Sequence, residues 1–262
     1  MRILTSKQKT WDLIFLCLIN IFAIVVTLVF KTNFLTSTIL FLGFPSFYLL
    51  YREKSYFEKI FFASVSSGIL FGFVFDFIAE LNKAWDWNGG LYFGKILGVV
   101  QIDVMIWFFL WVFHIFLFYE HFIDRKKLRS NFSKIAPKAF FANALSIILL
   151  LTIFKFDPSI LYFHKAYLLM CLVLLIPFLI ILARKPKLVF HTVPIVIYFI
   201  FVYLAHEVTA LNLGQWRFPG DYIGWVHVLG VTFPIEELVF WIILSSLMGA
   251  VFYEEEYDNR KN

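Results

Sequence analysis

Two adjacent acidic residues, Glu236 and Glu237, stand inside the apolar stretch from Phe233 to Trp241. A charged carboxylate in the middle of a membrane-spanning helix costs about 2.5–3.5 kcal/mol, so its presence there needs a reason. No Lys or Arg lies within a helical turn of the pair, and burial with mutual repulsion is expected to keep at least one carboxyl group protonated. A protonated carboxyl group in an apolar pocket is a proton donor to whatever shares that pocket.

The pair also fits a simpler interpretation as the start of a helix. Pro234 is suited to a first helical turn, where nearby acids are favoured by the helix dipole. Asp103 favours the chemical interpretation, because it occupies the matching position in an earlier apolar stretch, Gln101 to Val104.

Aromatic side chains follow these acids at helical spacing. Trp107 and Trp111 come four and eight positions after Asp103, so the three residues share one helix face. The acidic pair is followed in the same way, four positions on, by Phe240 and Trp241. Because an aromatic face attracts a cation, these four residues are candidates to stabilise a cationic intermediate. The chain holds 35 Phe residues, and most of them are expected to pack or to face lipid.

A second pair of acids, Asp76 and Glu207, stands nine residues before a tryptophan in each case. These acids are candidates for bases or proton relays beside the motif acids. Alternatively, they cap and hydrate the ends of helices. The residues expected to shape an outer lid are Asn82, Asn212, Trp85 and Trp216, and Phe218 is a further candidate for substrate binding. As interfacial anchors, their aromatic members would look the same in the sequence.

All of these residues belong to two similar stretches, 76–120 and 207–254. The offset between the stretches is 131 residues at the tryptophans and 133 at the motif acids, half of the 262-residue chain. Each stretch contains a turn, Asn88-Gly89-Gly90 or Pro219-Gly220-Asp221, and each closes on an aromatic-Tyr-Glu sequence. A duplicated unit with a buried carboxylate in each half is where the function should be sought.

The composition requires that these residues be positioned by membrane-spanning helices. Hydrophobic residues make up 61% of the chain, charged residues only 16%, and the mean hydropathy is +0.81, so a soluble domain is excluded. Alternation of period two is absent, which favours helices over a membrane barrel. The eight apolar segments expected to span a bilayer are 11–30, 34–51, 60–80, 91–119, 139–154, 160–183, 188–208 and 222–253.

Basic residues distribute unevenly between the two ends of these spans. With the N-terminus inside, 17 of the 23 Lys and Arg residues lie on the inner side. By the positive-inside rule both termini are cytoplasmic, in a multi-pass protein of the cell (inner) membrane. The net charge of +5 is therefore a topology signal and does not indicate a nucleic-acid partner.

The expected fold is an all-α integral membrane protein with about eight transmembrane helices in two parallel four-helix repeats. Residues 1–123 form the first repeat, residues 124–138 a basic cytoplasmic linker, and residues 139–262 the second repeat. Four spans per half give both halves the same orientation, and sites in such proteins lie at the repeat interface.

Several kinds of site are excluded by the absence of their motifs. Cys17 and Cys171 lie within apolar spans, so neither a disulfide framework nor a zinc site is expected. The chain has no Gly-rich phosphate loop and no nucleophile elbow. No metal and no cofactor is expected.

The pattern of acid, Trp-x-aromatic, turn and Gly-Val-x-x-Pro-Ile-Glu-Glu resembles the lycopene cyclase domain, a flavin-free integral membrane family. The match is best from Trp216 to Trp241, and two fused domains of that family would cover nearly the whole chain. The resemblance implies that Glu236 and Glu237 act in cyclisation. In the first half the proline and one acid are replaced, at Gln101 to Val104. Either that half is structural, or Asp103 alone suffices there.

The implied activity is that of an intramembrane carotenoid cyclase. An acid protonates the terminal double bond of a linear polyene, the tertiary cation closes a six-membered ring, and a base removes a ring proton. No net redox change occurs, in agreement with the lack of a dinucleotide fingerprint. The expected partners are a hydrophobic polyene from the bilayer, the lipid membrane, and a second copy of the chain or other enzymes of carotenoid synthesis.

Two alternatives come from other classes. Duplicated helical bundles with buried acids also suit a proton-coupled secondary transporter, although the spans lack broken-helix pairs and a polar substrate cluster. A membrane prenyltransferase is less favoured, because its paired Asp-rich magnesium motifs are missing and Asp76 with Glu80 makes only one loose pair.

Overall fold

The computed structural model describes residues 6–87, 93–124 and 132–257, and helices account for 77% of the structure. The turn at Asn88-Gly89-Gly90 and residues 125–131 of the expected linker 124–138 fall outside the described residues. The elements of the first half are α1 (Ser6–Phe30), α2 (Phe34–Thr38), η1 (Ile39–Gly43), α3 (Phe44–Arg52), η2 (Lys54–Tyr56), α4 (Phe57–Ser64), η3 (Val65–Phe71), α5 (Gly72–Leu81), β1 (Asp86–Trp87), β2 (Lys95–Ile96), β3 (Val100–Gln101), α6 (Ile102–Phe118) and η4 (Tyr119–Ile123). Those of the second half are α7 (Ala136–Phe156), η5 (Pro158–Leu161), α8 (Ala166–Arg184), α9 (Pro186–Thr192), α10 (Pro194–Asn212), β4 (Trp216–Arg217), β5 (Trp225–Val228), β6 (Val231–Pro234), η6 (Glu237–Leu244) and α11 (Ser245–Glu256).

Eight continuous helical segments of the described chain are long and apolar enough to cross a membrane. They are Lys7–Phe30, Phe34–Arg52, Lys54–Leu81, Ile102–Ile123, Ala136–Phe156, Ala166–Arg184, Pro194–Asn212 and Glu237–Glu256. Large apolar side chains on the outer helices are exposed, among them Phe22 at 56% and Ile148 at 62%. Such a surface is unfavourable in water, and the segments are those of a multi-pass membrane protein.

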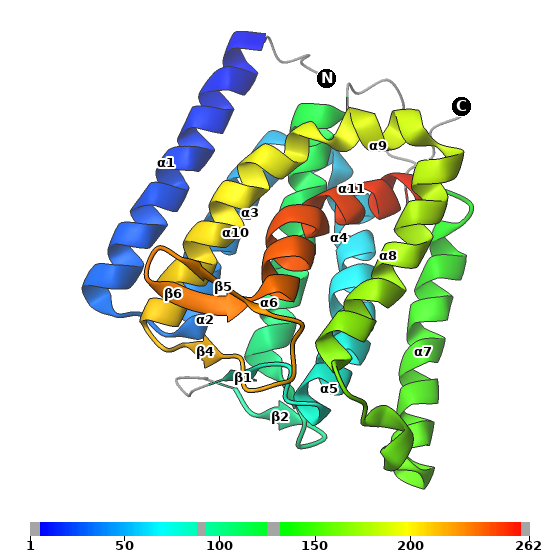
Figure 1. Ribbon diagram of the computed structural model, residues 1–262. Helices are drawn as coiled ribbons and strands as arrows, with labels where there is room; N and C mark the ends of the chain where they lie inside the picture. Colours follow the sequence, from blue (N-terminus) through cyan, green and yellow to red (C-terminus); the bar gives the residue numbers. More distant parts are fainter. Residues whose placement is uncertain (1–5, 88–92, 125–131, 258–262) are drawn as a thin grey trace.

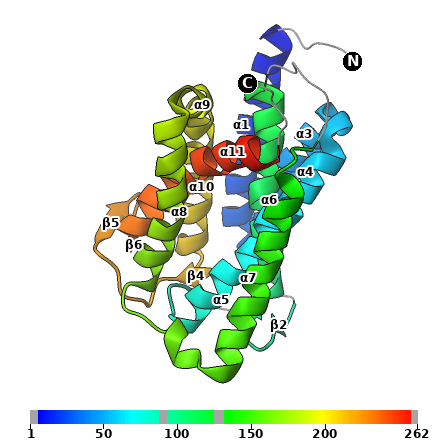
Figure 2. The ribbon, with the colours of Figure 1, turned by 90° about the vertical axis from the view of Figure 1, so that its right-hand side faces the viewer.

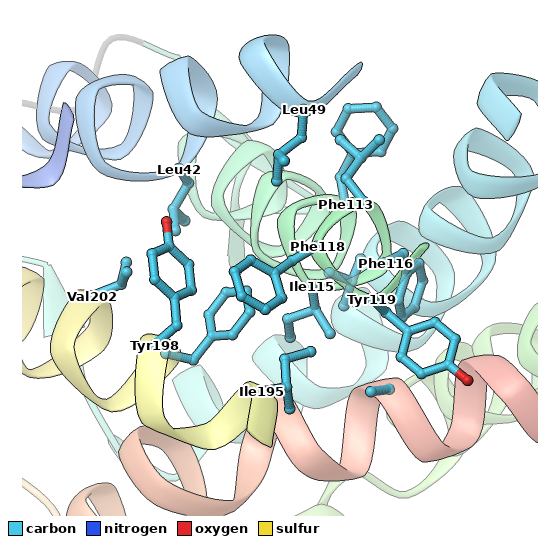
Figure 3. Packing of buried hydrophobic residues seen from close by; sticks show 14 of the residues in the cluster. Leu42, Leu49, Phe113, Ile115, Phe116, Phe118, Tyr119, Ile195, Tyr198 and Val202 are labelled. Carbon is cyan, nitrogen blue, oxygen red and sulfur yellow. The ribbon is translucent and has the colours of Figure 1, made fainter. Parts of the chain in front are cut away.

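Helix α6 lies at the centre of the bundle, between α3, α10 and α11 (Figures 1 and 3). The ring of Phe118, at the end of α6, stacks on that of Tyr198 of α10, with centroids 4.6 Å apart. Ile115 of α6 lies in the same layer (Figure 3). By contrast, α1 and α7 lie at the periphery (Figures 1 and 2). The residues on α6 are therefore the ones most enclosed by protein.

Four helical segments of the described chain are π-helical: η1, η3, η4 and η6. A π-turn changes the direction in which the following side chains point, and such turns occur often at functional sites. Segment η6 begins at Glu237 and contains Trp241, two of the residues that the sequence singles out.

The fourth and eighth spans begin later than the sequence predicts. The segments 91–119 and 222–253 were expected to be helical throughout, but each begins with a short antiparallel hairpin, β2–β3 or β5–β6. The hairpins turn at Leu97-Gly98 and Leu229-Gly230, where all four residues have positive φ. An apolar run that contains a left-handed Leu-Gly pair therefore folds as a hairpin, and the helix starts after it.

The two halves contact each other through matching residues. Strands β1 and β4 pair antiparallel, with Asp86 opposite Arg217, and these positions are separated by the 131-residue offset. Between the closing motifs, the Tyr119 hydroxyl donates to Glu254 at 2.5 Å. The Tyr253 hydroxyl donates to Glu120 at 2.6 Å. Each half thus gives a tyrosine to the other half's glutamate.

Glycines allow α6 to approach the third span closely. A Cβ added at Gly68 would lie 2.8 Å from Val112 Cγ2 and 2.9 Å from the Phe108 carbonyl oxygen. Small residues at such crossings let helix backbones pack closely in membranes.

We expect Gly68→Ala to lower the free energy of unfolding by about 1–3 kcal/mol, because backbone atoms of α6 must move away. The measurement is the thermal unfolding midpoint in detergent. Gly94→Ala is the matched control, since nothing lies within 4 Å of a Cβ built at Gly94. Equal midpoints for the two variants would contradict the close approach.

Candidate functional site

Two of the five candidate acids close the hairpins that precede their helices. The Asp103 carboxylate accepts a hydrogen bond from the Phe93 backbone N–H at 3.0 Å. The Glu236 carboxylate accepts one from the Ile223 N–H at 2.7 Å. Both acids are fully buried, and neither lines any of the three cavities described below. Asp103 and Glu236 are thus equivalent clasps, each holding the base of a hairpin against the start of a helix.

Glu237 is placed differently from its neighbour. Its carboxyl group is hydrogen-bonded to the Tyr167 hydroxyl of α8, and it lines two cavities. The first-half position that corresponds to Glu237 is Val104, by the 133-residue offset, and Val104 lines one of the same two cavities. Between the two adjacent glutamates, Glu237 is the one that can reach a ligand.

The acids Asp76 and Glu207 accept hydrogen bonds from the tryptophans nine residues on. The Trp85 indole donates to Asp76 at 3.0 Å, and the Trp216 indole donates to Glu207 at 3.2 Å. Glu207 shares both cavities with Glu237, whereas Asp76 lines none of the three cavities. The structure therefore brings Glu207, and not Asp76, to Glu237.

Two cavities contain both of these glutamates, and a third, apolar cavity adjoins them through shared tryptophans. The apolar cavity measures about 640 Å³ with its open mouth included, and its wall contains Phe71, Phe75, Phe240, Met248 and Phe252. The tryptophan cavity, about 360 Å³ by the same measure, contains Trp85, Trp87, Trp107, Trp216 and Trp241 with Glu207 and Glu237. The polar cavity, about 350 Å³, adds Tyr203 and His206 to the two glutamates.

Trp241 stands where the cavities meet, since it lines all three. Its ring lies 4.7 Å from that of Trp111 and 5.5 Å from that of Trp107, both edge to face. Trp107 and Trp111 are themselves parallel, 6.0 Å apart, as their spacing on one helix face predicts. A positive charge beside the glutamates would be surrounded by aromatic faces.

The remaining sequence candidates divide between the cavity walls and the outer loops. Phe240 lines the apolar cavity, Phe218 the tryptophan cavity and Trp216 two cavities. Asn82 lies outside the cavities and joins α5 to the segment after α7, donating to the Leu161 carbonyl and accepting from the Phe163 N–H.

Asn212 also lies outside the three cavities, and its amide donates to the Val208 carbonyl one turn back. Each asparagine forms hydrogen bonds at the end of a helix, and neither contacts any of the three cavities.

Three residues of the site carried no usable signal in the sequence. Tyr167 lies in a plain apolar span, 70 positions before the glutamate that it contacts. Tyr203 lies one helical turn before Glu207, and His206 directly precedes Glu207. This closeness to Glu207 in the sequence is the one hint that the two residues belong to the site. Neither Tyr203 nor His206 is part of the repeated pattern.

Tyr222 connects the outer loops of the two halves over the site. Its hydroxyl accepts from the Gly220 N–H at 2.9 Å and donates to the Ala84 carbonyl at 2.7 Å. Burial raises the pKa of Tyr222, so the phenol stays neutral and keeps its donor hydrogen. Gly220 is required here because a Cβ would meet the Lys83 carbonyl at 2.8 Å.

The arrangement places two carboxyl groups in cavities that share Trp241 with a large apolar cavity. In the described part of the chain, no group of three His, Cys, Asp or Glu residues could hold a metal ion. Comparison of the chain with protein-family models, curated proteins and solved structures gives no match. Function is therefore inferred from the residues and their geometry.

We expect a lipid-soluble carbodiimide to modify Glu237 and Glu207 in preference to Glu236 and Asp103. The reagent enters from an apolar phase, and only the first two carboxyl groups line cavities. Peptide mass spectrometry of the labelled protein locates the adducts, and the exposed carboxyl group of Asp157 serves as a labelling reference. Adducts on Glu236 without any on Glu237 would contradict the assignment.

Proposed function

We propose that this protein is an intramembrane carotenoid cyclase of the lycopene type, which forms cyclohexene end groups. The observation that carries the proposal is the pairing of Glu207 and Glu237 in a tryptophan-walled cavity that adjoins a large apolar one. A hydrocarbon substrate needs an acid in dry surroundings, aromatic faces for the cation and a nearby base. The family that the motifs resemble catalyses such a reaction.

In the proposed reaction, Glu237 gives its proton to the terminal double bond of the polyene. The tertiary cation is attacked by a double bond of the same chain, which forms one carbon–carbon bond and closes the ring. Glu207 then removes a proton from the ring to leave a double bond. Atoms and electrons balance without an oxidant or reductant, so the reaction requires no redox cofactor.

The position of Glu236 supports giving the acid's role to Glu237. Because Glu236 holds the Ile223 N–H at 2.7 Å, each gain and loss of its proton would weaken and restore this hydrogen bond, since a neutral carbonyl oxygen accepts more weakly than a carboxylate. Glu237 is held instead by the Tyr167 hydroxyl, on the rigid helix α8. Changes of protonation at Glu237 leave the hairpin clasp intact.

The proposal includes two parallel repeats within a membrane, with both termini cytoplasmic. Its support is the reciprocal Tyr119–Glu254 and Tyr253–Glu120 contacts and the antiparallel pairing of matching strands. Since Val104 stands where the first half would carry its own Glu237, each chain holds one acid centre. One end group is therefore cyclised per binding event.

We expect Glu237→Gln to lower cyclisation at least about 100-fold, because general acid catalysis contributes 10²–10⁴-fold. Glu236→Gln is the matched control. The glutamine oxygen can still accept from Ile223, so this variant should stay within a few fold of the wild-type rate. The assay is pigment analysis in a bacterial host that accumulates lycopene, normalised to the amount of protein in the membrane.

The opposite ranking of these two variants would overturn the assignment of the acid. Unchanged lycopene with the inserted wild-type chain would overturn the cyclase itself. In that case, proton-dependent uptake of a solute would support the transporter alternative.

We expect Trp241→Leu to lower the cyclisation rate roughly 30-fold, since a cation–π contact in a dry site contributes about 2 kcal/mol. Trp241→Phe keeps an aromatic face and should lose less. Trp11→Leu is the control, because Trp11 is 60% exposed on α1 and lines none of the three cavities. Equal rates for Trp241→Leu and Trp241→Phe would contradict a role for the ring.

A further inference from the structure

One wall of the polar cavity carries polar groups to which a hydrocarbon cannot form hydrogen bonds. On the side away from the apolar cavity, it presents Tyr203 and His206 beside Glu207 and Glu237. Tyr203 is 8% exposed and His206 4% exposed. The two residues come from consecutive turns of α10, so their polar atoms face one small space.

Three polar atoms on this wall have no hydrogen-bond partner among the described residues. They are the Tyr203 hydroxyl, His206 Nε2 and Trp107 Nε1. The Trp111 indole approaches the Tyr203 oxygen as a hydrogen-bond donor, so the phenol hydrogen is the part of this group that has no acceptor among the described residues. Buried polar groups in proteins are nearly always paired, and water is the usual partner when protein supplies none.

Water is the ligand that fits this chemistry. An ordered water needs two to four polar partners and space for about one molecule. The cavity offers a phenol, an imidazole, an indole and two carboxyl groups. The carboxyl groups are the proposed acid and base, so a water held here lies between the two groups that exchange the proton.

We infer that the polar cavity is a water site through which the proton taken by Glu207 returns to Glu237 after each ring closure. This inference rests on the proposed function. Each turnover leaves Glu237 without its proton and Glu207 with one more. The water accepts a hydrogen bond from protonated Glu207 and donates one to Glu237, and a shift of both protons restores the starting state. Water is neither formed nor consumed.

The tryptophans separate this water from the reacting cation. Trp107, Trp216 and Trp241 line both the polar cavity and the tryptophan cavity, where the cation forms beside Glu237. A water that passed these rings would capture the cation as a tertiary alcohol and prevent ring closure. The same three rings thus shield the cation from the water that serves its acid and base.

The test compares the first turnover with later ones, using lycopene and the full-length protein in lipid vesicles. The variant is Tyr203→Phe combined with His206→Leu. Because Glu237 carries its proton at the start, one ring per chain should form at the wild-type rate. Later turnovers should be at least about tenfold slower, since the proton must return without the held water. When the wild type is equilibrated in D2O before lycopene is added, the first ring should carry one deuterium, because the Glu237 carboxyl group exchanges its proton through the site water.

Three results would overturn the inference. The first is a double variant that matches the wild type in the first turnover and in later ones. The second is a double variant that is slow in the first turnover as well. The third is that wild-type rings made in D2O carry no deuterium. Should the double variant fail to fold, Tyr203→Phe alone, which removes one oxygen atom, decides by the same two phases. Tyr162→Phe is the control, because Tyr162 is exposed and lines none of the three cavities. A wild-type chain that forms no ring would overturn the proposed function, and this inference with it.

Discussion

A carboxyl group buried among apolar helices needs a hydrogen-bond donor, and that requirement organises the outer half of this protein. Each of the five buried candidate acids accepts a hydrogen bond: from an indole at Asp76 and Glu207, from a backbone N–H at Asp103 and Glu236, and from a phenol at Glu237. Four of these donors come from the loops and hairpins that connect the spans. Because an unpaired buried carboxylate is strongly destabilising, the loops are held where they are by the acids, and the acids by the loops.

Glu237 differs from the other four acids in where its donor comes from. Tyr167 belongs to a helix, so Glu237 is held without a loop depending on it. An acid that clasps a hairpin cannot change protonation without changing the strength of the clasp, since a charged acceptor oxygen binds an N–H more strongly than a neutral one. An acid anchored to a helix can do so while the surrounding fold stays fixed. A structural carboxyl group and a chemically active one therefore differ in how much of the surrounding fold depends on their protonation state.

The sequence predicts those features that depend on spacing along one segment. Local periodicity predicts the eight apolar segments and the shared helix face of Trp107 and Trp111. Local spacing also singles out the acids that stand nine residues before a tryptophan. The late starts of the fourth and eighth spans do not, because an apolar hairpin and an apolar helix look alike until the left-handed Leu-Gly pair is placed. The choice between Glu236 and Glu237 depends on that same start, since adjacent helical residues point about 100° apart. Tyr167 could not be predicted, because only the packing of α8 brings it to Glu237.

The contacts between the halves do not involve the position at which the two motifs differ. Tyr119, Glu120, Tyr253 and Glu254 join the halves through residues that both contain, and none of them lines any of the three described cavities. Val104 and Glu237 occupy matching positions and line the same tryptophan cavity, so both halves contribute to that one site. In the proposed cyclase, a carboxyl group at position 104 would bring a third acid into this cavity, where mutual repulsion and attracted water would oppose the proposed reaction. Valine there avoids that conflict without touching the contacts that hold the halves together. The proposed reaction thus has one acid, one base and an aromatic wall to which both halves contribute.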